Sequence, residues 1–278
     1  VESVEVENAR LKKVILRGKG WRILVKAPVF IDATGDGDVA YLAGASFEKG
    51  QKDTGVLQPP TMMFTVAGVD IDKTIDYLAE NPDQMERSKT IDCANGYDAD
   101  FFRSDPNFVM VAMRKLVSQL RAEGKMPIDR ENLIFISSLL PGEVHLNCTR
   151  HLGTDGSDVF SVTKAEIEGY LQIEKFVDTL RQYVPGFENC YIEKSADVVG
   201  VRESRRVMGD YVICGEDLKY GKQFPDTVVH NAFFCIDIHN PDGGGQAEEG
   251  NKPFEVEQYD LPYRAFVPLN VDALYTCG

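Results

Sequence analysis

The 278-residue sequence has no long apolar run, no basic run and no paired cysteine motif. A membrane helix needs roughly 20 consecutive apolar residues, and no stretch of this chain approaches that length, so we expect no membrane partner. With 30 Lys and Arg against 44 Asp and Glu, the net charge is -14. Such a charge disfavours nucleic acid and anionic membrane surfaces. The expected partner is a small-molecule substrate, and the sequence favours no particular oligomeric state.

The six cysteines are widely spaced and form no C-x-x-C pair. We therefore expect neither a zinc knuckle nor a thioredoxin-type motif, and we interpret the cysteines as buried free thiols in a reducing, cytoplasmic compartment. The four histidines show neither His-x-x-x-His nor Glu-x-x-His spacing, so no metal site is predicted. The absence of a Gly-x-Ser-x-Gly elbow argues against a serine hydrolase.

The residues that are present suit a globular chain, because 43% are hydrophobic and 27% are charged. Alternating apolar and polar residues from Val1 to Lys26 predict an antiparallel meander that turns at Gly18–Gly20. Apolar spacing predicts helices over 71–79 and 107–123, and a third that Thr163 and Glu166 start with a capping box. Its expected buried face is Ala165, Ile167, Leu171, Phe176, Val177 and Leu180. Strands are predicted at 61–66, 133–136, 143–147, 198–201, 233–238 and 273–275, which makes the fold class α+β.

The segment Val29–Asp38 reads as a short strand, a glycine turn and a helix that begins near Val39. Its first three residues are β-branched or aromatic, which predicts a strand buried on both faces. Thr34, Asp36 and Asp38 are residue types that cap helix N-termini. The pattern therefore predicts a strand-to-helix turn.

Gly35 and Gly37 permit a positive φ or the close approach of another group to the backbone. Together with Ala40 they also match the dinucleotide-binding fingerprint. Asp36 and Asp38, however, would place carboxylates where a pyrophosphate belongs. The turn is therefore not expected to cradle a pyrophosphate.

Three arginines occur within the five residues Arg202–Arg206, directly after an apolar run. If a helix starts here, Arg202 and Arg206 share one face, and Glu203 can orient a guanidinium group. A preorganised site for a carboxylate or phosphate is one interpretation. A structural network of ion pairs that clamps two elements is the other.

His145 and Asn147 lie two residues apart on a predicted strand, so their side chains are expected on the same side, with Arg150 and His151 following in a loop. This group suggests a polar wall beside a substrate or cofactor. The alternative is that His145 and Asn147 bond to loop backbone.

Asp237 and His239 are expected on one face of the predicted strand at 233–238. An aspartate beside a histidine can orient it for acid–base chemistry. The same pair can instead cap a turn.

The sequence resembles the FAD-dependent oxidoreductase family, which is distantly related to fumarate reductase flavoproteins. The stretch Ile31–Asp38, with its Ala-Thr-Gly end, is similar to the second FAD-contacting segment of two-domain flavoproteins. Further short matches follow in order along nearly the whole chain, at Gln58–Phe64, His145–Arg150, Gly200–Arg206, Asp237–Gly243 and Leu261–Arg264.

The resemblance implies FAD as cofactor and a hydride transfer between flavin and a small, anionic organic substrate. The implied FAD contacts are Thr34, Gly35, Asp36 and Gly37. The implied catalytic residues are His145 or His239 for proton movement, Arg202 for anion binding and Glu203 for orienting the arginines. The implied substrate-binding residues are Asn147, Arg150, Arg205 and Arg264.

The resemblance also implies a division into a partial FAD-binding domain (1–50), a substrate or cap domain (51–265) and a strand that returns to the FAD-binding domain (266–278). The family's N-terminal Gly-x-Gly-x-x-Gly unit and its last FAD-binding segment have no match, so we expect an internal fragment that is colourless and inactive alone. Two other classes stay open: a non-catalytic binding module, and a carbohydrate-active or hydrolytic enzyme that uses Asp/His pairs.

Overall fold

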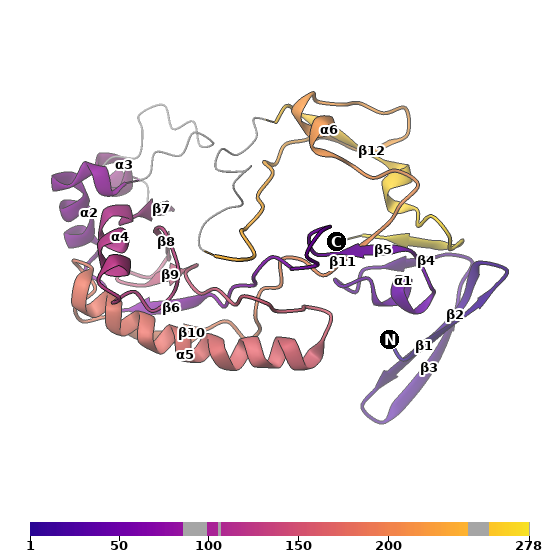
Figure 1. Cartoon of the computed structure of the whole chain (residues 1–278), viewed down its shortest axis with the longest axis horizontal. Coiled ribbons are helices and arrows are strands. Elements are labelled where there is room, and N and C mark those ends of the chain that lie inside the picture. Colours follow the sequence, from indigo (N-terminus) through magenta and orange to yellow (C-terminus); the bar gives the residue numbers. More distant parts are fainter. Residues whose placement is uncertain (86–98, 105–106, 244–255, 278) are drawn as a thin grey trace. The chain divides into compact units, whose positions relative to one another are not determined.

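The computed structural model describes residues 1–85, 99–104, 107–243 and 256–277 (Figure 1). They form two compact units. Unit 1 comprises the described residues within Val1–Leu57, Glu203–Ile238 and Glu248–Gly278, and unit 2 those within Gln58–Arg202 and His239–Ala247. Helices and strands occur in both, which confirms the α+β class. Residues 203–238, grouped with 51–265 in the sequence-based division, lie in unit 1; the functional names of the three predicted domains stay predictions.

The N-terminal meander of unit 1 is confirmed. It consists of β1 (Ser3–Glu7), β2 (Arg10–Gly18) and β3 (Trp21–Lys26) in the order β1-β2-β3. The second turn lies at Lys19–Gly20 as predicted, and the first is made by Asn8 and Ala9, both at positive φ (49° and 61°). Both turns thus use the left-handed conformations that tight hairpins require.

The segment that begins at Val29 forms β4 (Phe30–Asp32), the glycine turn and α1 (Asp38–Leu42). β4 pairs in parallel with β14 (Leu274–Thr276), and Thr276 lies opposite Asp32. The prediction of a strand buried on both faces is wrong, because Ile31 is 69% exposed and β14 is the single strand paired with β4 among the described residues. Apolar residues of β2, α1, β14 and the segments beside them form the small core of unit 1: Leu11, Val14, Val39, Ala40, Ala45, Val271 and Leu274.

The arginine-rich segment is a strand rather than the predicted helix start. β11 (Arg205–Val207) pairs antiparallel with β5 (Phe47–Lys49). The apolar run before it, predicted as a strand, makes only an isolated bridge between Gly200 and Thr61. In extended backbone successive side chains point to opposite sides, so the arginines separate instead of sharing a helix face.

The rest of unit 1 contains α6 (Gly215–Lys219), the hairpin-like pair β12 (Thr227–Ala232) and β13 (Tyr259–Pro262), and a 3-10 helix at Tyr263–Phe266. The strand predicted at 233–238 is wrong, since β12 occupies the preceding residues. Asn231 has a φ of 54° and donates its amide to Asp260, and the pairing register shifts there. This irregularity ends the strand before Phe233, which is 67% exposed.

Unit 2 is built on one five-stranded antiparallel sheet in the order β10-β6-β9-β8-β7. The strands are β6 (Phe64–Ala67), β7 (Val109–Ala112), β8 (Leu133–Ser137), β9 (Val144–Leu146) and β10 (Tyr191–Ser195). The helices are α2 (Ile71–Glu80), α3 (Ala99–Ser104), α4 (Arg114–Ala122), α5 (Val159–Tyr183) and a 3-10 turn at Pro82–Gln84. The long α5 runs alongside β6 and β10 (Figure 1).

The single helix predicted over 107–123 is wrong, because this range holds β7 followed by α4. The change occurs at Met113, which has a φ of 66°. Met110 and Ala112 are buried while Val109 is 42% exposed, which is the alternation of an edge strand. Short apolar runs of this kind fit a helix and a strand equally well.

The long helix α5 starts earlier than predicted, and its buried face agrees with the prediction at Ala165, Phe176, Val177 and Leu180 but not at two other positions. Asp158 caps it by accepting a hydrogen bond from the Phe160 amide, so the predicted capping box at Thr163 is wrong. Ile167 and Leu171 were expected inside, but they are 59% and 53% exposed. The buried residues are Ala165, Gly169, Ile173, Phe176, Val177 and Leu180.

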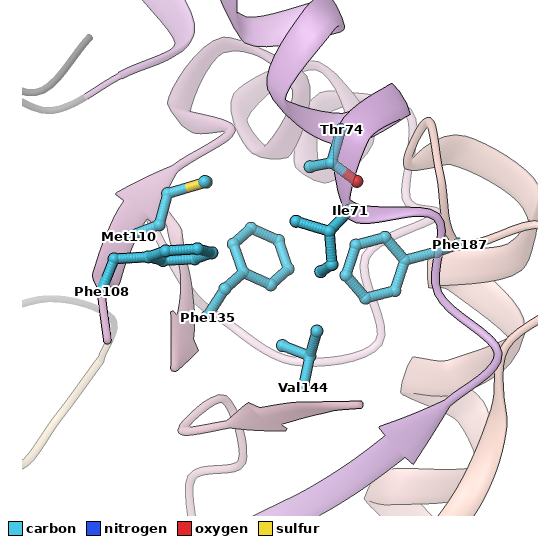
Figure 2. Close-up of a pocket in the computed structure, with 7 residues that line it drawn as sticks. All are labelled: Ile71, Thr74, Phe108, Met110, Phe135, Val144 and Phe187. Atoms are coloured by element: carbon cyan, nitrogen blue, oxygen red, sulfur yellow. The ribbon is translucent and has the colours of Figure 1, made fainter. Parts of the chain in front are cut away.

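Aromatic side chains fill the core of unit 2. Phe64 and Phe176 meet edge to face with ring centroids 6.0 Å apart, and the Phe135 and Phe187 centroids are 5.2 Å apart. Figure 2 shows Phe135, Phe187 and Ile71 pointing into a cavity of about 10 Å³. A void of this size holds at most one water and needs polar partners to keep it. The walls are apolar and the Thr74 hydroxyl already donates to the Pro185 carbonyl, so the cavity is a packing defect rather than a ligand site.

No described helix has the length and apolar character to span a bilayer. Within the same residues, no group of three metal-binding side chains occurs together. Cys148 and Cys190 are buried free thiols as expected, whereas Cys214 and Cys277 are exposed, so the expectation of uniform burial is wrong for those two; Cys93 lies outside the described residues.

Candidate functional site

The turn after β4 is organised by a carboxylate that the sequence analysis missed. Asp32 is only 2% exposed. It accepts hydrogen bonds from the Thr34 amide (3.1 Å), the Thr34 hydroxyl (2.7 Å) and the Ala40 amide (2.8 Å). The Thr34 hydroxyl in turn accepts from the Asp38 amide (2.8 Å). Asp32 and Thr34 thus satisfy the start of α1, and an acid at the end of an apolar strand was the available signal.

Gly35 and Gly37 adopt positive φ values of 86° and 64°, as predicted for the turn. A Cβ at Gly35 would meet no atom within 4 Å, whereas one at Gly37 would lie 3.1 Å from Val207 Cγ2. The backbone at Gly35 is therefore open to another group. Since two first-turn amides of α1 already bond to Asp32 and Thr34, the turn does not offer a pyrophosphate cradle.

This opening lies at the carboxyl ends of β4 and β14, which are parallel and in register. The Cys277 amide donates to the Asp32 carbonyl (3.0 Å) and fixes the two ends together. Ligands of open α/β sheets bind beyond the carboxyl ends of parallel strands. The turn thus combines a glycine without a covering side chain with the usual ligand-binding edge.

The arginines after Arg202 are engaged in ion pairs within unit 1. Arg205 donates to the Asp38 carboxylate (2.8 Å) and to the Asp36 carbonyl (2.9 Å), and its guanidinium group lies 4.3 Å from the centre of the Tyr41 ring. Its side chain is only 10% exposed. These contacts clamp β11 to the turn and match the structural interpretation of the arginine run.

Glu203 and Arg264 have partners of the same kind. Glu203 pairs with Arg206, which also donates to the Gly50 carbonyl (2.8 Å). Arg264 makes two hydrogen bonds to Asp226, of 2.9 and 3.2 Å, and these bonds raise the Arg264 pKa. The roles predicted for Arg205, Glu203 and Arg264 in substrate binding stay predictions.

One end of the sheet in unit 2 gathers a second group of predicted residues. Because the strands are antiparallel, the starts of β6 and β8 meet the ends of β9 and β10 there. Arg130 precedes β8, Arg150 follows β9 and Arg202 follows β10. Arg202 donates to the Thr61 hydroxyl (3.0 Å), and Thr61 and Gly200 exchange backbone hydrogen bonds of 3.2 and 2.8 Å.

The backbone at Arg150 is fixed by its neighbours. The Thr149 hydroxyl bonds to both the amide (2.7 Å) and the carbonyl (2.8 Å) of Met62. Gln172 of α5 accepts from the Arg150 amide (3.1 Å) and donates to the Arg150 carbonyl (2.8 Å). Arg150 is therefore held in place at the sheet end, where it is only 8% exposed.

Arg150 has an unusual charge environment. Burial, followed by the neighbouring guanidinium groups of Arg130 and Arg202, lowers the Arg150 pKa to about 10, and Asp129 and Glu131 partly oppose this. Arg150 still carries its charge near neutral pH. An attracting anion would relieve the repulsion among these cations.

Residues 239–240 reach the same sheet end. The His239 amide donates to the Gln58 side-chain oxygen (2.9 Å), and the Asn240 carbonyl accepts from Arg150. The structure thus brings together Arg150, Arg202 and His239. The predicted placement of Asp237 and His239 on one strand face is wrong, because no strand forms there and the two residues belong to different units.

His145 and Asn147 lie on and just after β9. His145 Nδ1 is 2.8 Å from the Thr65 hydroxyl, and its Nε2 is 4.0 Å from Glu143 Oε1. The Asn147 side-chain oxygen is buried and accepts no hydrogen bond from the described residues. The alternative that these side chains bond loop backbone therefore fails for His145 Nδ1 and for this oxygen.

His151, the last residue of the predicted polar group, is buried. It is 1% exposed, and neither ring nitrogen bonds to a described residue. A Cβ at Gly169 of α5 would lie 3.4 Å from its Cε1 atom. Burial lowers the His151 pKa, with Glu168 opposing it. The neutral ring is thus a packing element beneath α5.

A larger groove of about 360 Å³ lies between α2, α3 and the β8–β9 connection. Its walls combine apolar side chains such as Ile75 and Phe102 with the charged groups of Asp72 and Arg103. It contains none of the predicted site residues. The candidate sites are therefore the glycine turn of unit 1 and the arginine-bearing sheet end of unit 2.

Comparison with known proteins identifies the family to which the chain belongs. A family model described as FAD dependent oxidoreductase matches residues 1–278. The chain therefore belongs to the FAD dependent oxidoreductase family, and this membership supports an oxidoreductase with flavin-linked redox function. No curated protein matches the chain, and no solved structure matches it.

Proposed function

We propose that this chain supplies a flavin-contacting turn and a substrate-binding unit to an FAD-dependent oxidoreductase, which transfers a hydride between flavin and a small, anionic organic substrate. Family membership supports the flavin-linked class. The observation that carries the assignment to this chain is the open backbone at Gly35, beyond the carboxyl ends of two parallel strands.

The residues at the turn fit an uncharged part of FAD. FAD, when bound, supplies the hydride acceptor or donor. Gly35 leaves room for a flat group against the backbone, and Thr34 and Gly37 hold the turn's shape. Arg205 holds the Asp36 carbonyl and the Asp38 carboxylate, so its role is to position the turn. Glu203 and Arg264 have comparable structural pairings within unit 1.

On the substrate side, Arg150 and Arg202 are proposed to bind the anion. A guanidinium group suits a carboxylate or phosphate because its planar donors form paired hydrogen bonds. His239 lies at the same sheet end and is proposed to move a proton, with His145 on β9 as the other candidate. The buried Asn147 oxygen offers an acceptor for a substrate hydroxyl or amine.

Substitution of Gly35 tests the proposal. Gly35→Val adds a branched side chain where the cofactor is proposed to lie, so the flavin content of the purified parent protein that contains this chain should fall at least severalfold. Gly20→Val is a matched control, because Gly20 also has a positive φ (77°) and open space around its Cβ position. Visible absorbance per protein measures flavin content. Equal flavin content in two folded variants would contradict the assignment, and retained flavin without substrate-dependent reduction would favour a non-catalytic binding module.

A further inference from the structure

We propose that the outer face of α5 is an interface between two copies of this chain, whose α5 helices pair antiparallel about a twofold axis. The interface has no part in the function proposed above, because it concerns how the protein assembles. Its central residues are Ile167 and Leu171, which the sequence predicted to be buried and which lie exposed on α5.

The outer face of α5 carries apolar side chains that the core of unit 2 does not use. Phe160, Ile167 and Leu171 are 82%, 59% and 53% exposed. They belong to one stripe whose positions are alternately four and three residues apart, which is the spacing of a coiled-coil seam. The stripe consists of Phe160, Lys164, Ile167, Leu171, Glu174 and Asp178, opposite the buried face of the helix. Contiguous exposed apolar residues of this kind mark interaction surfaces.

The apolar residues at the middle of the stripe determine where the twofold axis passes. If Ile167 of each copy faces the partner's Leu171, the axis passes beside position 169. In an antiparallel pair, residues equally far from the axis in opposite directions face each other. Lys164 and Glu174 are each five residues from it, so Lys164 of each copy faces the partner's Glu174. A parallel pair would instead place like charges together at both positions.

Both charged side chains are accessible to a partner. Lys164 is 76% exposed, and its contact with Glu168 on the next turn is a long one, at 3.7 Å. Glu174 is exposed and forms no ion pair within the part of the chain that the structure describes. The two residues are ten positions apart, which is about 15 Å along the helix axis. An ion pair between Lys164 and Glu174 therefore requires two chains.

The interface uses one helix from each copy, and this limits its strength. Interfaces of small area belong to weak or transient complexes. We therefore expect a reversible equilibrium in which the monomer predominates at low protein concentration. The central apolar residues supply the attraction, and the two Lys164–Glu174 pairs select the antiparallel direction.

Sedimentation equilibrium of the parent protein that contains this chain, over a range of concentrations, tests the interface. Leu171→Ser removes an apolar side chain from both copies and should weaken dimerisation at least about tenfold, because burial of one leucine is worth more than a tenfold change in affinity. Leu139→Ser is the matched control, since it makes the same change in the same unit at a residue that is 90% exposed between β8 and β9. It should leave dimerisation unchanged.

Charge reversal tests the antiparallel register. Lys164→Glu alone and Glu174→Lys alone each place like charges opposite each other across the interface, so each should weaken dimerisation. The double variant restores opposite charges at both pairs and should dimerise like the unaltered protein. Because the two positions are about 15 Å apart in one helix, this recovery can arise only between chains. High salt should reduce the difference between the single and double variants.

A monomer at every concentration would overturn the interface and would leave the stripe to unit 1 or to a different protein. A dimer that Leu171→Ser leaves unchanged would also overturn it, because the contact would then use another surface. A double variant that dimerises no better than the single variants would overturn the antiparallel register. Circular dichroism shows whether each variant is folded, and Ile167→Ser takes the place of Leu171→Ser if the latter is not.

Discussion

The two units use their charged residues differently. In unit 1, Arg205 pairs with Asp38, Arg264 with Asp226 and Lys222 with Asp217, and the Asp226 hydrogen bonds raise the Arg264 pKa. In unit 2, burial and two neighbouring guanidinium groups lower the Arg150 pKa to about 10. The difference shows that density of arginine in sequence does not identify an anion site. The carboxylate partners of Arg205 and Arg264 in the fold identify those two residues as clamps.

The hydrophobic cores differ as well. Unit 2 packs α2, α4 and α5 on a five-stranded sheet around several phenylalanines. Unit 1 distributes its strands among sheets of two and three strands, and among its described residues the core cluster holds seven buried apolar residues. Burial of apolar area is the main source of folding free energy. Unit 2 therefore depends on packing, whereas unit 1 depends more heavily on hydrogen bonds and ion pairs such as those of Asp32 and Arg205.

The largest expected effect is on the core of unit 2. Phe176→Ala removes a fully buried ring that contacts Phe64, and it should lower the free energy of unfolding by about 3–5 kcal/mol. Leu171→Ala, on the same helix but 53% exposed, should change it by less than about 1 kcal/mol. Urea unfolding followed by circular dichroism measures both. Equal losses would show that Leu171 is buried, as first expected from the sequence.

That helix also shows how far the sequence could predict the fold. The periodic spacing identified a long helix, but Ile167 and Leu171 are as apolar as the residues that are buried. Only the path of the sheet beneath α5 decides which stripe is covered. The same ambiguity placed a helix over β7, because four apolar residues next to a true helix continue its pattern. Alternation in β1–β3 is less ambiguous, and that meander was predicted correctly.

The candidate site was predictable in its residue types but not in its grouping. The glycine turn follows from local sequence, because a positive φ favours glycine. Asp32 was missed, since its role depends on an amide eight residues along the chain. Arg130, Arg150 and Arg202 meet through strand pairings between segments up to 72 residues apart. Arg202 and Arg205 are near neighbours in sequence but make their contacts in different units.

A second, smaller effect separates those two arginines. Arg205→Gln breaks a largely buried ion pair and should lower the free energy of unfolding by about 2 kcal/mol. Arg202→Gln, at an exposed position, should change it by less than about 0.5 kcal/mol, while weakening binding of phosphate or malonate. Thermal melts and anion titration of both variants are the measurements. The reverse pattern would return Arg205 to the anion site and make Arg202 the structural residue.

The smallest expected effect is a loss of stability in acid, which should begin at a higher pH in unit 2 than in unit 1. Burial lowers the pKa of His151 below its ordinary 6.5 in folded unit 2, so the unfolded chain binds a proton more readily. This contribution to stability is present above pH 6.5 and is lost as the pH falls below it. In unit 1, burial of Asp217 is outweighed by hydrogen bonds from Lys222, the Cys214 amide and Tyr211, which lower its pKa to about 2. That contribution is lost only as the pH falls below 3.8 towards 2.

Between pH 6.5 and 4, these two groups should therefore weaken unit 2 and leave unit 1 unchanged. Hydrogen exchange of α5 peptides reports on unit 2, and fluorescence of Trp21, the single tryptophan and a residue of β3, reports on unit 1. We expect α5 to exchange faster as the pH falls through this range, after correction for the intrinsic pH dependence of exchange. His151→Phe removes the titrating ring from an apolar site and should abolish the acceleration, because no proton is then taken up there on unfolding. An acceleration that persists in His151→Phe would assign the acid sensitivity to another group and leave the buried histidine as packing alone.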